Sequence, residues 1–143
     1  MNREKLLDLF AQHSDLLNMG STDDAPSTEW IEKAESALSL VLPDDYKWFL
    51  KNFGGGDICG DEIYSIYCIP FEEAVGGDLI YQNTIANNYL NEGRLVVSNT
   101  DFGEEFYFDT KELKTIYVAL GEEHKLYASD FIEFLYKRLM SYI

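Results

Sequence analysis

The segment WIEKAESALSLVLPDDYKWFLKNFGGGD, residues 30–57, has the pattern of two amphipathic helices separated by a proline. Ser27 is placed to cap the first helix, whose apolar residues fall near one face: Trp30, Ile31, Ala34, Leu38 and Val41. Pro43 blocks continuation of that helix but suits the first turn of a new one. The glycines at 54–56 end the second helix, because the residue just past a helix end often adopts a left-handed conformation that glycine tolerates.

The second helix, which begins after Pro43, needs a hydrophobic core to pack against. Asp44 and Asp45 lie at its N-terminus, where the helix dipole favours negative charge. Its apolar side chains recur at helical spacing, namely Leu42, Tyr46, Phe49, Leu50 and Phe53. Nearly every residue of the segment therefore has an ordinary structural role, and Trp48 is the one candidate for partial exposure.

The remaining sequence predicts an α+β domain. Capping signals and helical spacing predict three more helices: residues 3–17 with Asn2 as N-cap, residues 78–90, and a last helix capped by Ser129. Strands are predicted at 62–69, 95–98, 105–109 and 115–120, the middle two joined by a hairpin loop at 99–103. We expect a single domain over residues 1–143, with a mainly antiparallel sheet of about four to five strands packed against N-terminal and C-terminal helices.

Three motifs in this chain resemble the SUKH superfamily, which groups many bacterial immunity proteins with a yeast cell-wall-synthesis regulator. The first is hydrophobe-Leu-Pro followed by Asp-Asp-Tyr-Lys-x-Phe-Leu and the glycine run, residues 41–56. The second is the hairpin RLVVSNTDFGEEFYFD at 94–109, and the third is ASDFIEFL at 128–135. The resemblance implies a family-like core over residues 27–143, preceded by an N-terminal helix and polar loop over residues 1–26. It also implies a non-enzymatic protein that binds a protein partner.

Negative charge is the second informative property of the sequence. The chain has 26 acidic and 11 basic residues, a formal net charge of −15. Between residues 52 and 110 there are eleven acids, and Arg94 is the only base. Such a surface repels phosphate, which argues against binding to nucleic acid or an anionic membrane, and it attracts a basic protein. The alternative is that acidity only keeps the protein soluble.

The residue patterns indicate no catalytic, cofactor or metal site. The acid clusters at 57–62 and 101–105 lack the spacing of an EF-hand loop, and His13 and His124 have no spaced metal-ligand partners. No Gly-x-Ser-x-Gly elbow is present, and the glycines at 54–56 are not followed by the Gly-Lys-Ser/Thr of a phosphate loop. We therefore expect no enzymatic activity and no cofactor.

The two cysteines, Cys59 and Cys68, are expected to be reduced. The N-terminal sequence MNREKLLDLF lacks the apolar run of a secretory signal, so we expect a cytoplasmic protein. No stretch approaches the roughly 20 apolar residues of a membrane span. In a strand at 62–69, Cys68 and Ile66 share one face, which predicts that Cys68 is a small buried hydrophobe rather than a nucleophile.

The leading hypothesis is an immunity protein that neutralises one cognate bacterial toxin by stoichiometric binding, occluding a basic surface such as the substrate cleft of a nuclease. The alternative is a non-enzymatic regulatory or scaffold module that binds a host protein. In both cases we expect the partner to contact acidic residues and neighbouring tyrosines of the predicted sheet: Asp57, Asp61, Glu62, Tyr64, Asp101, Glu104, Glu105 and Tyr107.

Overall fold

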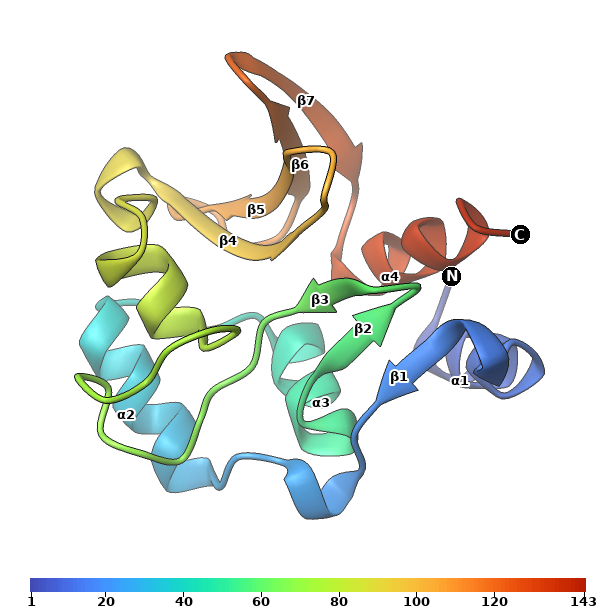
Figure 1. The fold of residues 1–143 in the computed structure, drawn as a ribbon, viewed down its shortest axis with the longest axis horizontal. Helices are drawn as coiled ribbons and strands as arrows, with labels where there is room; N and C mark the ends of the chain where they lie inside the picture. The colour runs from blue at the N-terminus through green and yellow to red at the C-terminus, as the bar shows by residue number, and fades with distance from the viewer.

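Seven strands form one antiparallel sheet in the computed structural model, which describes residues 1–143 (Figure 1). Each strand pairs with its neighbour in the chain, and the order is β1 (Leu17–Met19), β2 (Gly56–Ile58), β3 (Asp61–Ile63), β4 (Arg94–Asn99), β5 (Glu104–Asp109), β6 (Ile116–Leu120) and β7 (Glu123–Ala128). The helices are α1 (Arg3–Gln12), α2 (Thr28–Leu38), α3 (Asp44–Phe53) and α4 (Phe131–Met140). The sheet and helices make a single α+β domain, as expected.

The helix-proline-helix prediction is confirmed. The Ser27 hydroxyl accepts a hydrogen bond from Trp30 N at 3.3 Å, so it caps α2. The Glu35 carboxylate accepts hydrogen bonds from Leu42 N at 2.8 Å and from Lys47 Nζ at 3.1 Å. These two bonds tie the end of α2 to the first turn of α3. Val41 departs from the predicted apolar face, because α2 ends at Leu38 and the Val41 side chain is 69% exposed.

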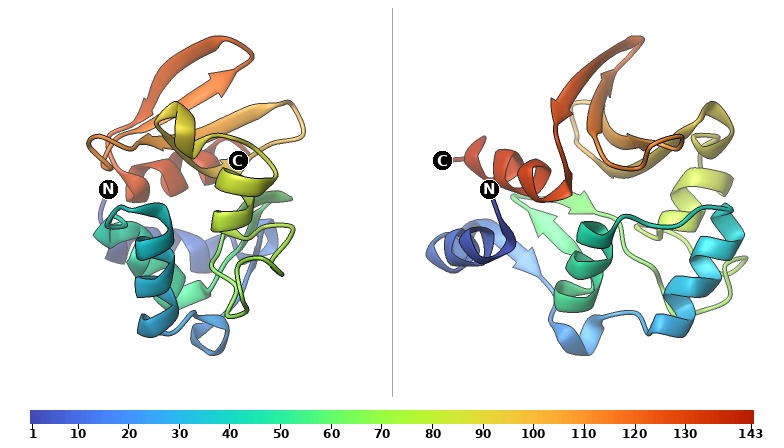
Figure 2. Two further views of the ribbon diagram at one scale, coloured as in Figure 1. Left: turned by 90° about the vertical axis from the view of Figure 1, so that its left-hand side faces the viewer. Right: turned by 180° about the vertical axis from the view of Figure 1, so that it is seen from behind.

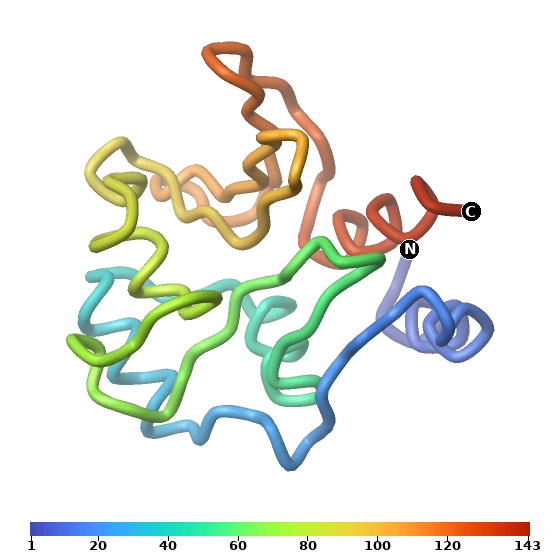
Figure 3. The backbone as a smooth tube through the Cα atoms, in the orientation of Figure 1, coloured from blue at the N-terminus to red at the C-terminus, as the bar shows by residue number.

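The sheet bends strongly, and α3 and α4 pack against its inner face (Figures 1 and 2). Phe131, at the start of α4, is central to this packing. Its ring lies 5.2 Å from Tyr46 and 5.6 Å from Phe49 of α3, and 6.1 Å from Phe108 of β5. One aromatic side chain therefore joins both helices to the sheet. The long connection from residue 64 to residue 93 passes beside α2, on the side of the molecule away from α1 and the C-terminus (Figures 1 and 3).

The two halves of the sheet, β1–β3 and β4–β7, are joined by little regular pairing. The only Cα partners between β3 and β4 are Ile63 and Ser98, supplemented by a hydrogen bond from Tyr64 N to Val97 O. Beyond this point the edge of β4 is completed by the side chain of Asn83. Its amide accepts from Val96 N at 2.8 Å and donates to Val96 O at 2.9 Å, so that it replaces a neighbouring strand.

Three parts of the strand prediction were wrong. The sheet has seven strands rather than four to five. The strands that the sequence did not predict are β1, β2 and β7. The predicted strand at 62–69 ends at Ile63, because Ser65 then exchanges backbone hydrogen bonds with Gly77 and Leu79 instead of extending the ladder. Cys68 consequently lies outside any strand and is exposed, as is Cys59, and both thiols are free.

The helix boundaries also need correction. The predicted helix at 3–17 ends at Gln12, and Leu17 begins β1, although Asn2 does cap α1 through a bond from Lys5 N. The predicted helix at 78–90 is a short helical stretch around a π-helical turn, Tyr81–Ile85, followed by a separate 3₁₀ turn. Asp130, not Ser129, caps α4 by accepting from Glu133 N. No helix has both the length and the apolar character needed to cross a bilayer.

Replacing Asn83 tests its role as a substitute strand. The change Asn83→Ala leaves the buried N–H and C=O of Val96 without partners, and each unsatisfied group costs about 1–3 kcal/mol. We expect the free energy of unfolding, measured by urea denaturation, to fall by about 2–5 kcal/mol. Asn91→Ala, at an exposed position, is the matched control and should change it by less than about 0.5 kcal/mol. Equal effects of the two changes would contradict this role.

Candidate functional site

A row of polar side chains crosses the outer face of the sheet, the face opposite α3 and α4. The strand register gives one residue from each strand in order: Asn18, Asp57, Glu62, Asn99, Glu105, Ala119 and His124. Only Ala119 is apolar, and Glu62 and Asn99 are the chain neighbours of the single β3–β4 pair, Ile63 and Ser98. Three of the acids expected to contact a partner, Asp57, Glu62 and Glu105, are therefore brought into one line. Asn18 and His124, at the two ends of this row, are 106 positions apart in the chain, and the pairing of successive strands places them on one face.

The β5 part of the row is engaged in contacts within the chain, because Arg94 pairs with both Glu105 and Glu92. Arg94 Nη1 lies 3.0 Å from the Glu105 carboxylate, and the Tyr89 hydroxyl donates to the same group. The Arg94 guanidinium also covers the ring of Tyr107, at 5.2 Å from its centroid, and Tyr107 is 8% exposed. The hydroxyl of Tyr107 is hydrogen bonded to His124 Nδ1 at 2.6 Å. Glu105 and Tyr107 thus belong to a closed network and offer little free charge or surface.

Two other residues expected at the interface lie inside the protein. Asp61 points to the inner face, where Arg138 Nη2 of α4 lies 2.7 Å from its carboxylate and only 8–10% of either side chain is exposed. The Tyr142 hydroxyl donates to the same carboxylate, and this hydrogen bond raises the pKa of Tyr142 to about 12. Tyr64 is 2% exposed, and its hydroxyl donates to Asn99. These two residues support the sheet rather than present a contact surface.

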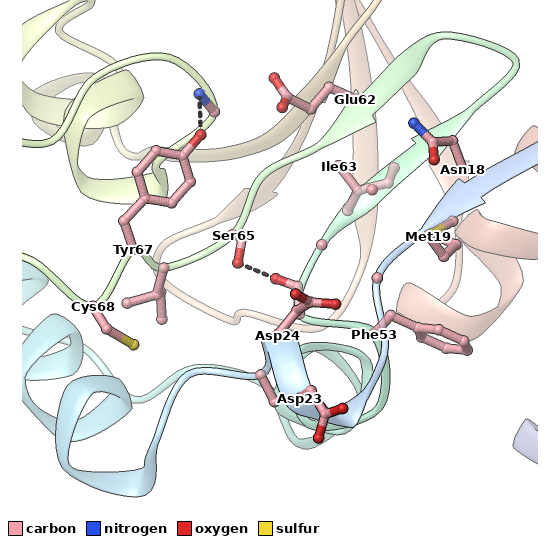
Figure 4. A pocket seen from close by; sticks show the side chains of 17 residues that line it. Asn18, Met19, Asp23, Asp24, Phe53, Glu62, Ile63, Ser65, Tyr67 and Cys68 are labelled. Atoms are coloured by element: carbon pink, nitrogen blue, oxygen red, sulfur yellow. Dashed lines mark hydrogen bonds between the residues drawn. The ribbon is translucent and has the colours of Figure 1, made fainter.

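The unpaired charge gathers at the other end of the row, in a cleft beside β1–β3 (Figure 4). The cleft has a volume of about 590 Å³. Glu62 lies at one end of it, and Asp23 and Asp24 lie at the opposite end, with Ser65 between them. None of the 17 residues that line the cleft is Lys, Arg or His. Asp23, Asp24 and Glu62 are its only charged lining residues, so all of its charge is negative.

Glycines form much of the cleft wall, and Gly54 and Gly56 are among those that cannot be replaced without strain. Gly54, the residue that ends α3, has a φ of +73°, and an added Cβ would lie 2.5 Å from Asp24 O. Gly56 has a φ of +149°, and its Cβ would lie 2.4 Å from Asn18 O. The glycine run at 54–56 is longer than a helix end requires. Gly54 lets Asp24 approach the end of α3 closely, and Gly56 lets β1 approach β2.

Glu62 is the carboxylate best placed to meet a ligand. It is exposed at the cleft rim, rests against the Cα of Gly77, and takes no part in any ion pair of the chain. Partial burial, and then the nearby charge of Asp57, raise the pKa of Glu62 above its ordinary value of 4.5. Asp57 itself is held by Gly60 N at 2.9 Å and by the Asn18 amide. A cation placed beside Glu62 would relieve the repulsion from Asp57.

The two remaining predicted residues lie in the β4–β5 hairpin. Asp101 is exposed, and Glu104 accepts a hydrogen bond from the Thr100 hydroxyl at 3.1 Å. The cleft residues Asn18, Asp23 and Asp24 were not among the predicted contacts, because they lie in a segment expected to be a surface loop. The sequence feature that could have identified Asp23 and Asp24 is the pair of adjacent acids, which the fold places against the glycine run at 54–56. No three His, Cys, Asp or Glu side chains are grouped to hold a metal ion.

The model of the SMI1 / KNR4 family (SUKH-1) matches residues 25–137. This range contains all three of the motifs by which the sequence resembles the SUKH superfamily. It also contains β2 and β3, whereas β1 and the Asp23–Asp24 side of the cleft precede it.

The buried Asp61–Arg138 pair predicts a large stability difference. Arg138→Met leaves the Asp61 carboxylate buried without its cation, so we expect unfolding free energy to fall by about 3–5 kcal/mol. The double variant Asp61→Asn with Arg138→Met should recover part of this loss, because no unpaired charge is left. Arg3→Met, which breaks the exposed pair with Asp45, is the control and should cost less than about 1 kcal/mol. A loss for Arg138→Met no greater than for this control would refute the pairing argument.

The raised pKa of Glu62 can be measured directly by NMR titration of its side-chain carboxyl. We expect a midpoint above 4.5 in the native protein. In Asp57→Asn the midpoint should move down toward 4.5 without reaching it, because burial is the larger cause and remains. Asp8→Asn, far along the chain on α1, should leave the midpoint unchanged. A native midpoint at or below 4.5 would show that the cleft does not disfavour the ionised carboxylate.

Proposed function

Because the chain belongs to the SMI1 / KNR4 family (SUKH-1), we propose that it is an immunity protein that binds and neutralises one cognate bacterial toxin. The observation that carries the proposal is the acidic, glycine-walled cleft beside β1–β3, which contains no base. Its partner is a protein that carries a basic surface. We expect the complex to form in the cytoplasm without any catalytic step.

Electrostatic complementarity supports this assignment. The net charge of −15 speeds the approach of a basic partner. Glu62, Asp23 and Asp24 form no ion pair within the chain and give the partner's cations a place to bind, although Asp24 also accepts a hydrogen bond from Ser21 N at 2.8 Å. The glycines let β1 and the Asp23–Asp24 turn pack closely against the end of α3 and β2, which holds these carboxylates around the cleft. Inhibition would follow by occlusion, because a basic substrate cleft covered by this surface is closed to substrate. A nuclease is the kind of toxin that suits this mechanism best.

The alternative is a regulatory module that binds a host protein. The two functions are separated by the neighbouring reading frame and by growth rescue. We expect the gene beside this one to encode a protein with a toxin domain, and co-expression of the present chain to restore growth of cells that express that domain. Failure to rescue, together with capture of a resident protein by the same surface, would favour the regulatory function.

Charge reversal in the cleft tests the electrostatic part of the proposal. In the double variant Asp23→Lys with Glu62→Lys, both carboxylates become cations at exposed positions. Because the reversed charges repel a basic partner, we expect toxin affinity, measured by calorimetry, to fall about tenfold or more and its salt dependence to flatten. Growth rescue should weaken in parallel.

The matched control is Asp8→Lys with Glu112→Lys, which changes the net charge equally at exposed sites outside the cleft. This variant should keep toxin affinity within about twofold at physiological salt, where the Debye length is about 8 Å. Circular dichroism should show both variants folded. An equal loss of affinity in the two double variants would mean that overall charge, not the cleft, governs binding.

A further inference from the structure

A second groove, separate from the acidic cleft, lies between α2 and the turn that follows Pro70. Its volume is about 580 Å³, and its walls are the aromatic rings of Trp30 and Phe71. The two ring centroids are 5.7 Å apart, and the ring planes meet at 80°. Backbone hydrogen bonds from Glu73 N to Pro70 O and from Ala74 N to Phe71 O fix the turn that carries Phe71. The groove is therefore a corner made of two aromatic faces held by ordered backbone.

The rim of this aromatic corner is acidic. Glu29 and Glu32 come from α2, and Glu72 comes from the turn, whereas Lys33 is the only base among the lining residues. Ile69 and Val75, next to the turn, are 40% and 61% exposed and extend the apolar surface. Aromatic faces surrounded by carboxylates attract a cation, because the ring quadrupole and the negative charges act in the same direction.

The chain already holds one ammonium group in this groove. Lys33 Nζ lies 4.5 Å from the centroid of the Trp30 ring and 3.2 Å from the Glu29 carboxylate. Half of the Lys33 side chain and three quarters of the Glu29 side chain are exposed, and exposed pairs of this kind contribute little to stability. Lys33 is therefore easily displaced. The ring of Phe71, in contrast, has no cation over it, and Glu32 and Glu72 form no ion pair within the chain.

We propose that this groove binds a lysine or arginine side chain of a protein partner. The alkyl stem lies along Pro70 and Phe71, and the charged end lies among Glu32, Glu72 and the Trp30 ring. Lys33 acts as an internal competitor for the Trp30 face. The proposal goes beyond toxin binding, because it concerns a different surface and does not depend on the partner's identity. Loss of this site would leave the cleft proposal standing, and the reverse also holds.

The test uses NMR titration of the full chain with the capped peptide Ac-Gly-Lys-Gly-NH₂ and its uncharged analogue, in which norleucine replaces lysine. The chain has two tryptophans, and a Trp48→Phe variant assigns their indole N–H signals. Trp48 is an internal reference, because its surroundings are mainly basic, with Arg3, Lys47 and Lys51 against one acid, and repel a lysine peptide. We expect a saturable shift of the Trp30 signal with a dissociation constant in the millimolar range, and no saturable shift at Trp48 or with norleucine.

Two variants then separate a binding groove from general attraction to an acidic protein. Lys33→Met removes the competitor, and we expect it to tighten peptide binding about two- to fivefold. Glu32→Gln with Glu72→Gln should weaken binding about threefold or more. Asp23→Asn with Glu62→Asn removes equal charge from the acidic cleft and should leave the groove unaffected. The proposal is overturned if Trp30 shows no saturable shift, if norleucine binds equally, or if the rim and cleft variants have the same effect.

Discussion

The arrangement of this sheet depends on the buried ion pair between Asp61 of β3 and Arg138 of α4. Regular pairing between β3 and β4 is limited to one residue pair, so the ladder alone does not fix the two halves of the sheet relative to each other. Arg138 lies 4.7 Å from the centroid of Phe106 on β5 while it reaches Asp61 on β3. A single side chain of α4 thus connects both halves.

The position of the acidic cleft follows from this connection. Glu62 is the chain neighbour of Asp61 and points to the opposite face, because successive side chains of a strand alternate. Fixing Asp61 on the inner face therefore fixes Glu62 on the outer face, at the cleft rim. Asp61 was expected to contact the partner, and its role is instead to orient the residue beside it. The acid that we propose to bind the partner and the acid that supports the sheet differ by one position in the sequence.

Much of the fold could be predicted from local signals. The cap at Ser27, the break at Pro43, the end of α3 at Gly54 and the β4–β5 hairpin all depend on neighbours in the sequence. By contrast, β1 and β2 have three residues each, too few for alternation to be recognised. β7 was missed because four of its six residues are exposed at the sheet edge, so that its sequence, EHKLYA, looks like a loop. The strand predicted at 62–69 fails because Ser65 pairs with residues 77–79, a long-range contact that no local pattern reveals.

The charged face was predictable in sign but not in detail. The excess of acids between residues 52 and 110 is visible in the sequence, but the pairing that removes Glu105 and Asp61 from the free charge depends on Arg94 and Arg138 being brought to them by the fold. The free carboxylates line one cleft that contains no base. Asp23 and Asp24 precede α2 in the sequence, and Glu62 follows it, so only the fold brings them together. Zero-length carbodiimide cross-linking of the chain to its purified partner, read by mass spectrometry, tests this placement most directly. The account predicts bonds from Glu62, Asp23 or Asp24 to lysines of the partner, and cross-links confined to acids outside the cleft would contradict it.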